Sequence, residues 1–77
     1  MPFVPADYSP PPGALLREVR GSLNLTQQES ADAAGVSRRS WVRYEQEEIS
    51  IQRPALLAFC YSFDIDPVIF GLKKRTK

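Results

Sequence analysis

A single glycine, Gly35, lies between two short stretches of helical spacing and constrains the fold of this chain more than any other residue. The stretch before it opens on TQQE, a capping box in which Thr26 accepts an amide hydrogen bond from the first turn and Glu29 reaches back to the Thr26 amide. Glycine readily adopts the left-handed conformation that ends a helix. Ser37 is a suitable cap for a second helix two residues later. The segment therefore predicts two short helices joined by a tight turn.

Three further helices are predicted around this pair, which covers residues 26–35 and 38–46. Apolar residues at positions 15, 16, 19 and 23 repeat with helical spacing, so one helix is expected over residues 13–23. Pro54 suits the first turn of another, and Asp66 followed by a proline opens a short last helix. No segment has the pattern of a strand. The sequence thus predicts an all-α fold of five short helices.

Composition divides the chain into three parts. The first thirteen residues hold five of the seven prolines, which lack an amide hydrogen and favour extended or turn geometry. We therefore expect an extended arm over residues 1–13, a helical domain over residues 14–72 and a basic tail, KKRTK, over residues 73–77. A chain of 77 residues supports one hydrophobic core and not two.

Residue usage argues against several classes of function. The chain has no histidine, and its one cysteine, Cys60, lies in the apolar segment ALLAFCYSF, which predicts a buried core residue. Without a paired-carboxylate site or a phosphate-binding loop, the chain is not expected to be an enzyme or to hold a metal, a cofactor or a small-molecule ligand. It has no long apolar run and no signal-peptide pattern, so a cytoplasmic protein without membrane contact is expected.

The predicted helix over residues 38–46 has two different faces. Trp41 and Tyr44 are three residues apart and point to one side, where they are expected to pack in the core. Arg39 and Arg43 are four residues apart on another face, and no acidic residue occurs between positions 36 and 44. The net charge of the whole chain is only +1, but the charge is sorted along the chain: this helix is basic, Glu45, Glu47 and Glu48 form a negative block after it, and the tail is basic again.

The spacing of small and apolar residues fits a helix-turn-helix, in which the second helix enters the major groove of DNA. With Gln27 as the first position, the motif requires a small residue at the fifth position, a glycine at the ninth, and apolar residues at the tenth, fifteenth and eighteenth. The chain supplies all five: Ala31, Gly35, Val36, Trp41 and Tyr44.

The segments TQQESADAAGVSRRSWVRYE and ALLAFCYSFDIDPVIFG resemble the core of the Xre, Cro and phage-repressor type of helix-turn-helix regulators, over about residues 14–72. The resemblance implies a five-helix, lambda-repressor-like DNA-binding domain. The fragment SRRSWVRYE is also similar to segments of small phage and prophage regulators, including repressors of anti-CRISPR operons.

The resemblance also implies which residues meet DNA. The arginines of the recognition helix would read bases, because their forks pair with N7 and O6 of guanine: Arg38, Arg39 and Arg43. Phosphate contacts and helix ends would fall on four polar residues: Thr26, Gln27, Ser37 and Ser40. A further implied contact is an ion pair between the first and third helices, formed by Arg20 and Glu45.

The chain departs from the resembling family at two places. Ser30 stands where the family prefers leucine, and Glu47 stands where many members have glycine after the recognition helix. A glutamate with left-handed backbone costs roughly 1 kcal/mol, so that loop is expected to take another path. The acidic run EQEE is expected to face away from DNA.

These observations predict a sequence-specific regulator of transcription that binds double-stranded DNA, with a repressor at an inverted-repeat operator as the favoured form. Six apolar residues exceed what five short helices need to enclose: Ile49, Ile51, Val68, Ile69, Phe70 and Leu72. All of them except Phe70 are expected at a homodimer interface. A two-fold dimer would place its recognition helices roughly 34 Å apart. One alternative is an antitoxin that also binds a toxin, and a second is a protein-interaction module with no sequence preference on DNA.

Overall fold

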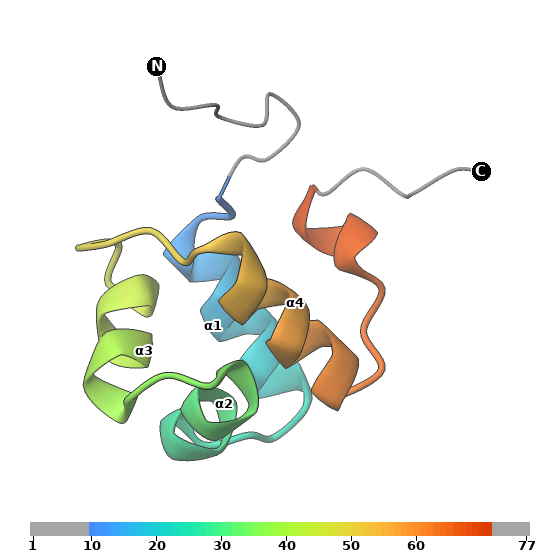
Figure 1. Cartoon of the computed structure of the whole chain (residues 1–77), viewed down its shortest axis with the longest axis horizontal. Coiled ribbons are helices and arrows are strands. Elements are labelled where there is room, and N and C mark those ends of the chain that lie inside the picture. Colours follow the sequence, from blue (N-terminus) through green and yellow to red (C-terminus); the bar gives the residue numbers. More distant parts are fainter. Residues whose placement is uncertain (1–9, 72–77) are drawn as a thin grey trace.

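The computed structural model describes residues 10–71, which contain four α-helices and one short 3₁₀ helix joined by loops (Figure 1). They are α1 (Gly13–Ser22), α2 (Gln27–Ala34), α3 (Arg38–Glu45), α4 (Arg53–Ser62) and the 3₁₀ helix η1 (Pro67–Phe70). No strand occurs in these residues. The all-α prediction is confirmed, and the helices begin and end within a residue or two of the expected positions.

The expected fifth helix is wrong as an α-helix. The Asp66 carboxylate accepts the amide of Val68 at 3.0 Å, and the amide of Gly71 returns to the Val68 carbonyl at 2.9 Å. Gly71 then has left-handed backbone with a φ of 86°. Only four residues fit between these two ends, so they close with the shorter spacing of a 3₁₀ turn.

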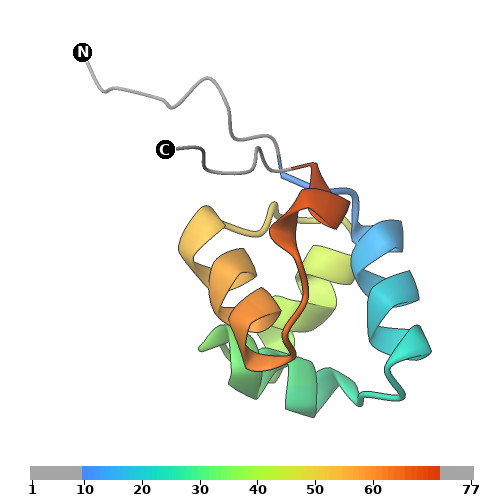
Figure 2. The same ribbon diagram turned by 90° about the vertical axis from the view of Figure 1, so that its right-hand side faces the viewer.

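The core lies where α2 packs against α3 and α4 and where α1 packs against α3. Phe59 of α4 is fully buried at the centre of this core. The centroid of its ring lies 4.9 Å from that of Trp41, 5.3 Å from that of Phe63 and 6.5 Å from that of Phe70. Trp41 is also fully buried, as predicted. Both described ends of the chain, at Pro10 and Gly71, lie at the pole of the molecule opposite α2 (Figure 2).

Cys60 is buried and unpaired, as predicted. Burial, and to a smaller extent the charge of Asp66, raises the pKa of the Cys60 thiol to about 11. The side chain therefore behaves as a small apolar residue of the core. Within residues 10–71, no helix has the length and apolar character needed to cross a bilayer.

Two of the residues expected at a dimer interface are exposed: Val68 is 44% exposed and Ile69 is 50% exposed, both on η1. Ile51 was a wrong choice, because its side chain is 1% exposed and fills the core, leaving no surface for a partner. Ile49 is partly buried and also packs against the core. Leu72 lies outside the described residues.

All four α-helices end in the same closure. A residue with left-handed backbone follows each helix: Asn24, Gly35, Glu47 and Asp64. The amide of the next residue then returns to a carbonyl of the last turn, at 2.8 to 3.0 Å: Leu25 to Arg20, Val36 to Ala31, Glu48 to Arg43 and Ile65 to Cys60. This pattern is the Schellman motif, which usually places an apolar residue at that next position.

The path expected for the loop after α3 is wrong, because Glu47 does adopt the left-handed conformation, with a φ of 63°. The hydrogen bond from the Glu48 amide to the Arg43 carbonyl, at 3.0 Å, holds Glu47 in a conformation that usually requires glycine. Closure of the helix end therefore outweighs the local strain at Glu47.

Replacing Glu47 by glycine is expected to stabilise the fold by about 1 kcal/mol, since glycine has no Cβ to strain at this φ. The free energy of unfolding, measured by urea denaturation, checks this. Asn24→Gly is the matched control: asparagine tolerates the left-handed region, so its gain should be clearly smaller. A loss of stability in Glu47→Gly would contradict the strain assigned here.

Candidate nucleic-acid interface

The α2–α3 pair has the local structure that its sequence predicts. Thr26 Oγ1 accepts the Glu29 amide at 3.0 Å, and the Thr26 amide donates to Glu29 Oε1 at 2.8 Å, which confirms the capping box. Gly35 turns the chain with a φ of 76°. Ala31 is fully buried, so only a small side chain fits where α2 meets its neighbours. Two short helices are thus held in a fixed arrangement by a three-residue connection, residues 35–37.

The two faces of α3 have different environments. Trp41 and Tyr44 are 0% and 8% exposed, with their rings 6.1 Å apart in an edge-on arrangement. Arg38 and Arg39 are exposed at the first two positions of the helix. Neither makes a hydrogen bond or ion pair to the rest of residues 10–71. Their guanidinium groups are therefore available to a ligand.

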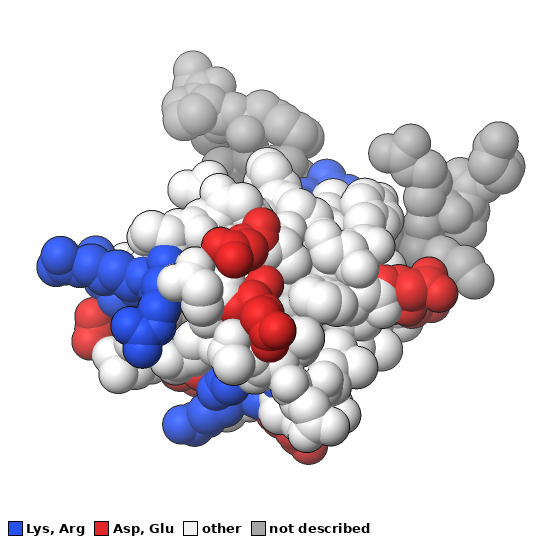
Figure 3. All heavy atoms as spheres, turned by 90° about the horizontal axis from the view of Figure 1, so that it is seen from below, with Lys and Arg blue, Asp and Glu red and all other residues white. Residues whose placement is uncertain are grey.

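The position of these two arginines is unfavourable for the helix itself. The amino end of a helix carries partial positive charge, and a cation there costs about 0.3–1 kcal/mol. The first turn of α3 contains no acidic residue to offset them. In Figure 3, basic side chains project from the left-hand edge of the domain, the side on which α3 lies in Figure 1. Stability does not account for these arginines, whereas binding of a polyanion does.

A buried carboxylate, Glu45, connects three elements beneath this face. Arg20 of α1 donates to it through Nε at 2.5 Å and through Nη2 at 3.1 Å. Trp41 Nε1 donates at 2.6 Å, and Gln27 Nε2 of α2 donates at 3.3 Å. The ion pair that the resemblance implied is confirmed, and it is one part of a larger network. Glu45 thereby fixes α1, α2 and α3 relative to one another.

The network keeps Glu45 ionised. Burial alone would raise the pKa of this carboxyl group, but hydrogen bonds from Arg20, Trp41 and Gln27, with the charge of Arg20, outweigh burial and lower the pKa below its ordinary value of 4.5. Arg20 also donates through Nη1 to the Leu25 carbonyl at 3.0 Å. Both charges of the pair are therefore hydrogen-bonded as well as neutralised, as buried charges require.

The four expected phosphate and helix-end residues lie at the starts of α2 and α3. Gln27 is half-buried and uses one amide hydrogen on Glu45, which leaves the other free to donate. Ser37 Oγ accepts the Ser40 amide at 3.1 Å, which confirms it as the cap of α3. The Ser37 hydroxyl donates to Ser40 Oγ at 3.1 Å, so the Ser40 proton remains available. These groups supply donors beside the exposed arginines.

Arg43, the third expected base-reading residue, differs from the other two. Its Nε lies 3.3 Å from Glu48 Oε1, and the two side chains are 43% and 54% exposed. The acidic run expected to face away from DNA therefore touches α3 through Glu48. The ion pair occupies Nε alone, so both Nη groups of Arg43 have no partner in residues 10–71.

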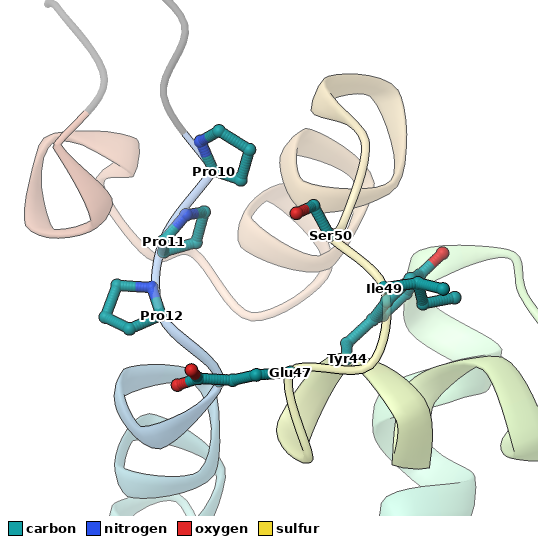
Figure 4. A pocket seen from close by; sticks show the side chains of 8 residues that line it. Pro10, Pro11, Pro12, Tyr44, Glu47, Ile49 and Ser50 are labelled. Carbon is teal, nitrogen blue, oxygen red and sulfur yellow. The ribbon is translucent and has the colours of Figure 1, made fainter.

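A surface pocket of about 260 Å³ lies between the proline segment and the loop after α3 (Figure 4). Pro10, Pro11 and Pro12 form one wall, and Glu47 extends from the loop toward the start of α1. The exposed arginines do not line it, so it is separate from the candidate DNA surface. Within residues 10–71, no cluster of three acidic, cysteine or histidine side chains is arranged to hold a metal ion.

Sequence reasoning missed two residues that position the site, Gly13 and Phe59. A Cβ on Gly13 would lie 2.4 Å from the carbonyl oxygens of both Tyr44 and Glu45, so α1 approaches the end of α3 too closely for any side chain. Phe59 centres the core beneath α3. Ser30, which the sequence marked as a departure from the leucine that the resembling family prefers, is fully buried, and its hydroxyl has no hydrogen-bond partner in residues 10–71. Spacing could have indicated Phe59, whereas a close approach such as that of Gly13 leaves no signal in one sequence.

The fold and the arginine-bearing helix define an all-helical helix-turn-helix domain of the DNA-binding class. The chain belongs to the helix-turn-helix domain family, whose profile matches residues 13–68. This match spans all four α-helices and the start of η1. A comparison with curated proteins finds no match to the chain.

Proposed function

We propose that this chain is a sequence-specific regulator of transcription of the Xre, Cro and phage-repressor type, which acts in the cytoplasm and represses by occupying a partly palindromic operator. It binds DNA and performs no chemistry. One observation carries the proposal: Arg38 and Arg39 are exposed and unpaired at the end of α3 where a helix disfavours cations.

The geometry beneath these arginines supports base reading rather than loose electrostatic attraction. Trp41 and Tyr44 anchor α3 in the core, and Glu45 ties α3 to α1 and α2. A rigid helix presents its arginines at fixed spacing, and a fixed fork can pair with guanine N7 and O6. Donors at Gln27 and Ser40 lie at the helix starts, where contacts to phosphate set the register on the duplex.

The repressor is proposed to act as a homodimer through the exposed residues of η1. Val68 and Ile69 are exposed, so removing their side chains from water would favour association. A two-fold dimer of this class would offer two α3 helices to successive turns of DNA. Operator half-sites are then expected roughly 34 Å apart, centre to centre.

Selection from a pool of random duplex DNA at about 150 mM salt tests the proposal, because weak electrostatic binding is suppressed there. Enrichment of an inverted repeat is the expected result, and it would support the regulator and the dimer together. Enrichment of a single half-site would support the role as a regulator and contradict the homodimer. No enrichment with a folded protein would overturn the proposal in favour of a protein partner, and co-purification of a second protein would favour the antitoxin form.

Substitutions at Arg43 and Gln27 are expected to separate base reading from positioning. Arg43→Ala should lower the preference for the selected site over random DNA by about 2 kcal/mol, because it removes a guanine contact. Gln27→Ala should weaken binding to both DNAs alike, because phosphate carries no sequence. Fluorescence anisotropy with both duplexes gives the two ratios, and circular dichroism confirms folding. Equal loss of specific and random binding in both variants would contradict this division of roles.

A further inference from the structure

The end of α3 lacks the apolar contact with the core that follows each of the other three α-helices. After the left-handed residue, Leu25, Val36 and Ile65 each pack an apolar side chain against the core. The corresponding residue after α3 is Glu48, which is 54% exposed and touches Arg43 instead. A helix closure without its apolar contact gives up local stability, and departures of this kind are expected where a residue serves function.

The same two residues are joined twice. The Glu48 amide donates to the Arg43 carbonyl at 3.0 Å, and Arg43 Nε donates to Glu48 Oε1 at 3.3 Å. The backbone closure brings Glu48 back over the last turn of α3, so its carboxylate lies beside the guanidinium of Arg43. Because only Nε is engaged, the Nη edge remains free, and that edge can meet guanine N7 and O6 end on.

We propose that Glu48 is a positioning residue that sets the sequence specificity of Arg43; this role rests on the proposed function. Glu48 limits the conformations of the guanidinium, so Arg43 loses less freedom when it meets the right base and reaches fewer alternative phosphates. The Glu48 carboxylate also repels phosphate and weakens binding to every DNA sequence. Glu48 therefore lowers general affinity and raises discrimination between sites.

The test compares affinity for the selected operator with affinity for random duplex in Glu48→Ala. Exposed ion pairs are weak, so the expected effects are small: about threefold tighter binding to random DNA and an about fivefold lower ratio of specific to random affinity. Glu48→Leu restores the apolar residue of the other closures, so it should keep or raise stability and still lose specificity. Glu48→Gln keeps an acceptor for Nε and should recover part of the ratio.

Glu47→Ala is the matched control, since Glu47 carries the same charge one residue away and makes no ion pair within residues 10–71. It should tighten random binding without changing the ratio. In an Arg43→Ala background, Glu48→Ala should leave the ratio unchanged. An equal effect of Glu47→Ala, or an undiminished effect without Arg43, would overturn the positioning role.

A DNA-free measurement separates this role from the proposed function. The Nε–H resonance of Arg43 in ¹⁵N-labelled protein should shift and exchange faster with water in Glu48→Ala, while Glu47→Ala leaves it in place. A wild-type protein without sequence preference would overturn the proposed function and this role with it. A preference that survives Glu48→Ala unchanged would overturn only the role of Glu48.

Discussion

Replacing Glu45 by alanine is expected to destabilise the fold by about 3–5 kcal/mol, the usual loss when one partner of a buried charge pair is removed. The Arg20 side chain, which is 19% exposed, would lose its counter-charge, and the Trp41 indole N–H would lose its acceptor at 2.6 Å. A domain of this size is stable by only about 0.05–0.15 kcal/mol per residue, so this loss would remove a large part of its free energy of unfolding. Urea denaturation followed by circular dichroism measures the loss.

Glu48→Ala is the control for this prediction, because Glu48 forms an exposed pair whose removal should cost less than about 1 kcal/mol. The double variant Arg20→Ala with Glu45→Ala should lose less than the sum of the two single variants, since each single change strands the other charge. A loss below about 1 kcal/mol in Glu45→Ala would show that the network does not hold α1, α2 and α3 together.

Acid should weaken the protein through the same residue. The pKa of Glu45 is lowered in the folded state, so its ionised form binds the network more strongly than the protonated form. Its contribution is complete above the ordinary pKa of 4.5 and is lost as pH falls through the lower folded-state value. Glu45→Gln should therefore be less stable than wild type at neutral pH and lose less stability between neutral pH and pH 3. Parallel slopes in the two proteins would contradict this assignment.

Gly13→Ala is expected to be the second large effect, a loss of about 3 kcal/mol, at the upper end of the range for overpacking. The new Cβ would lie 2.4 Å from two backbone carbonyl oxygens, neither of which can rotate away as a side chain can. The start of α1 would then have to move from the end of α3, disturbing the Arg20–Glu45 pair.

Gly21→Ala provides the control on the same helix. Beyond its chain neighbours and the backbone of its own helix, no atom lies within 4 Å of a Cβ at Gly21, so alanine should stabilise α1 by about 0.5–1 kcal/mol through helix propensity. Opposite signs for the two substitutions in urea denaturation are the expected result. A stabilised Gly13→Ala variant would mean that α1 and α3 are farther apart than the structure has them.

Local signals in the sequence predicted most of the helix-turn-helix. Thr26, Glu29, Gly35 and Ser37 act on amides a few residues away, so their roles can be derived from spacing alone, and the observed bonds agree. Trp41 and Tyr44 are three residues apart on one helix, so they lie on the same face, and that face packs in the core. The Arg20–Glu45 pair came from the resemblance, since no local spacing links residues 25 apart.

Three other features were not predicted from the sequence. The length of η1 is set by Asp66 and Gly71 together, and Ile51 is buried because the loop before α4 turns into the core. Glu47 adopts left-handed backbone because the hydrogen bond from the Glu48 amide to the Arg43 carbonyl closes the end of α3. The base-reading and dimer assignments are still predictions that await DNA and assembly measurements.

The nearness of the two described chain ends, at the pole opposite α2, permits a tandem construction (Figure 2). Two copies joined head to tail would carry their connection on that pole, and a Gly/Ser linker of about 30 residues has a root-mean-square span of about 30 Å. Pairing within one polypeptide replaces a bimolecular equilibrium by an effective concentration in the millimolar range. Under the proposed dimer, occupancy of an operator by such a covalent tandem would rise in proportion to its concentration, without the threshold that separate subunits would impose.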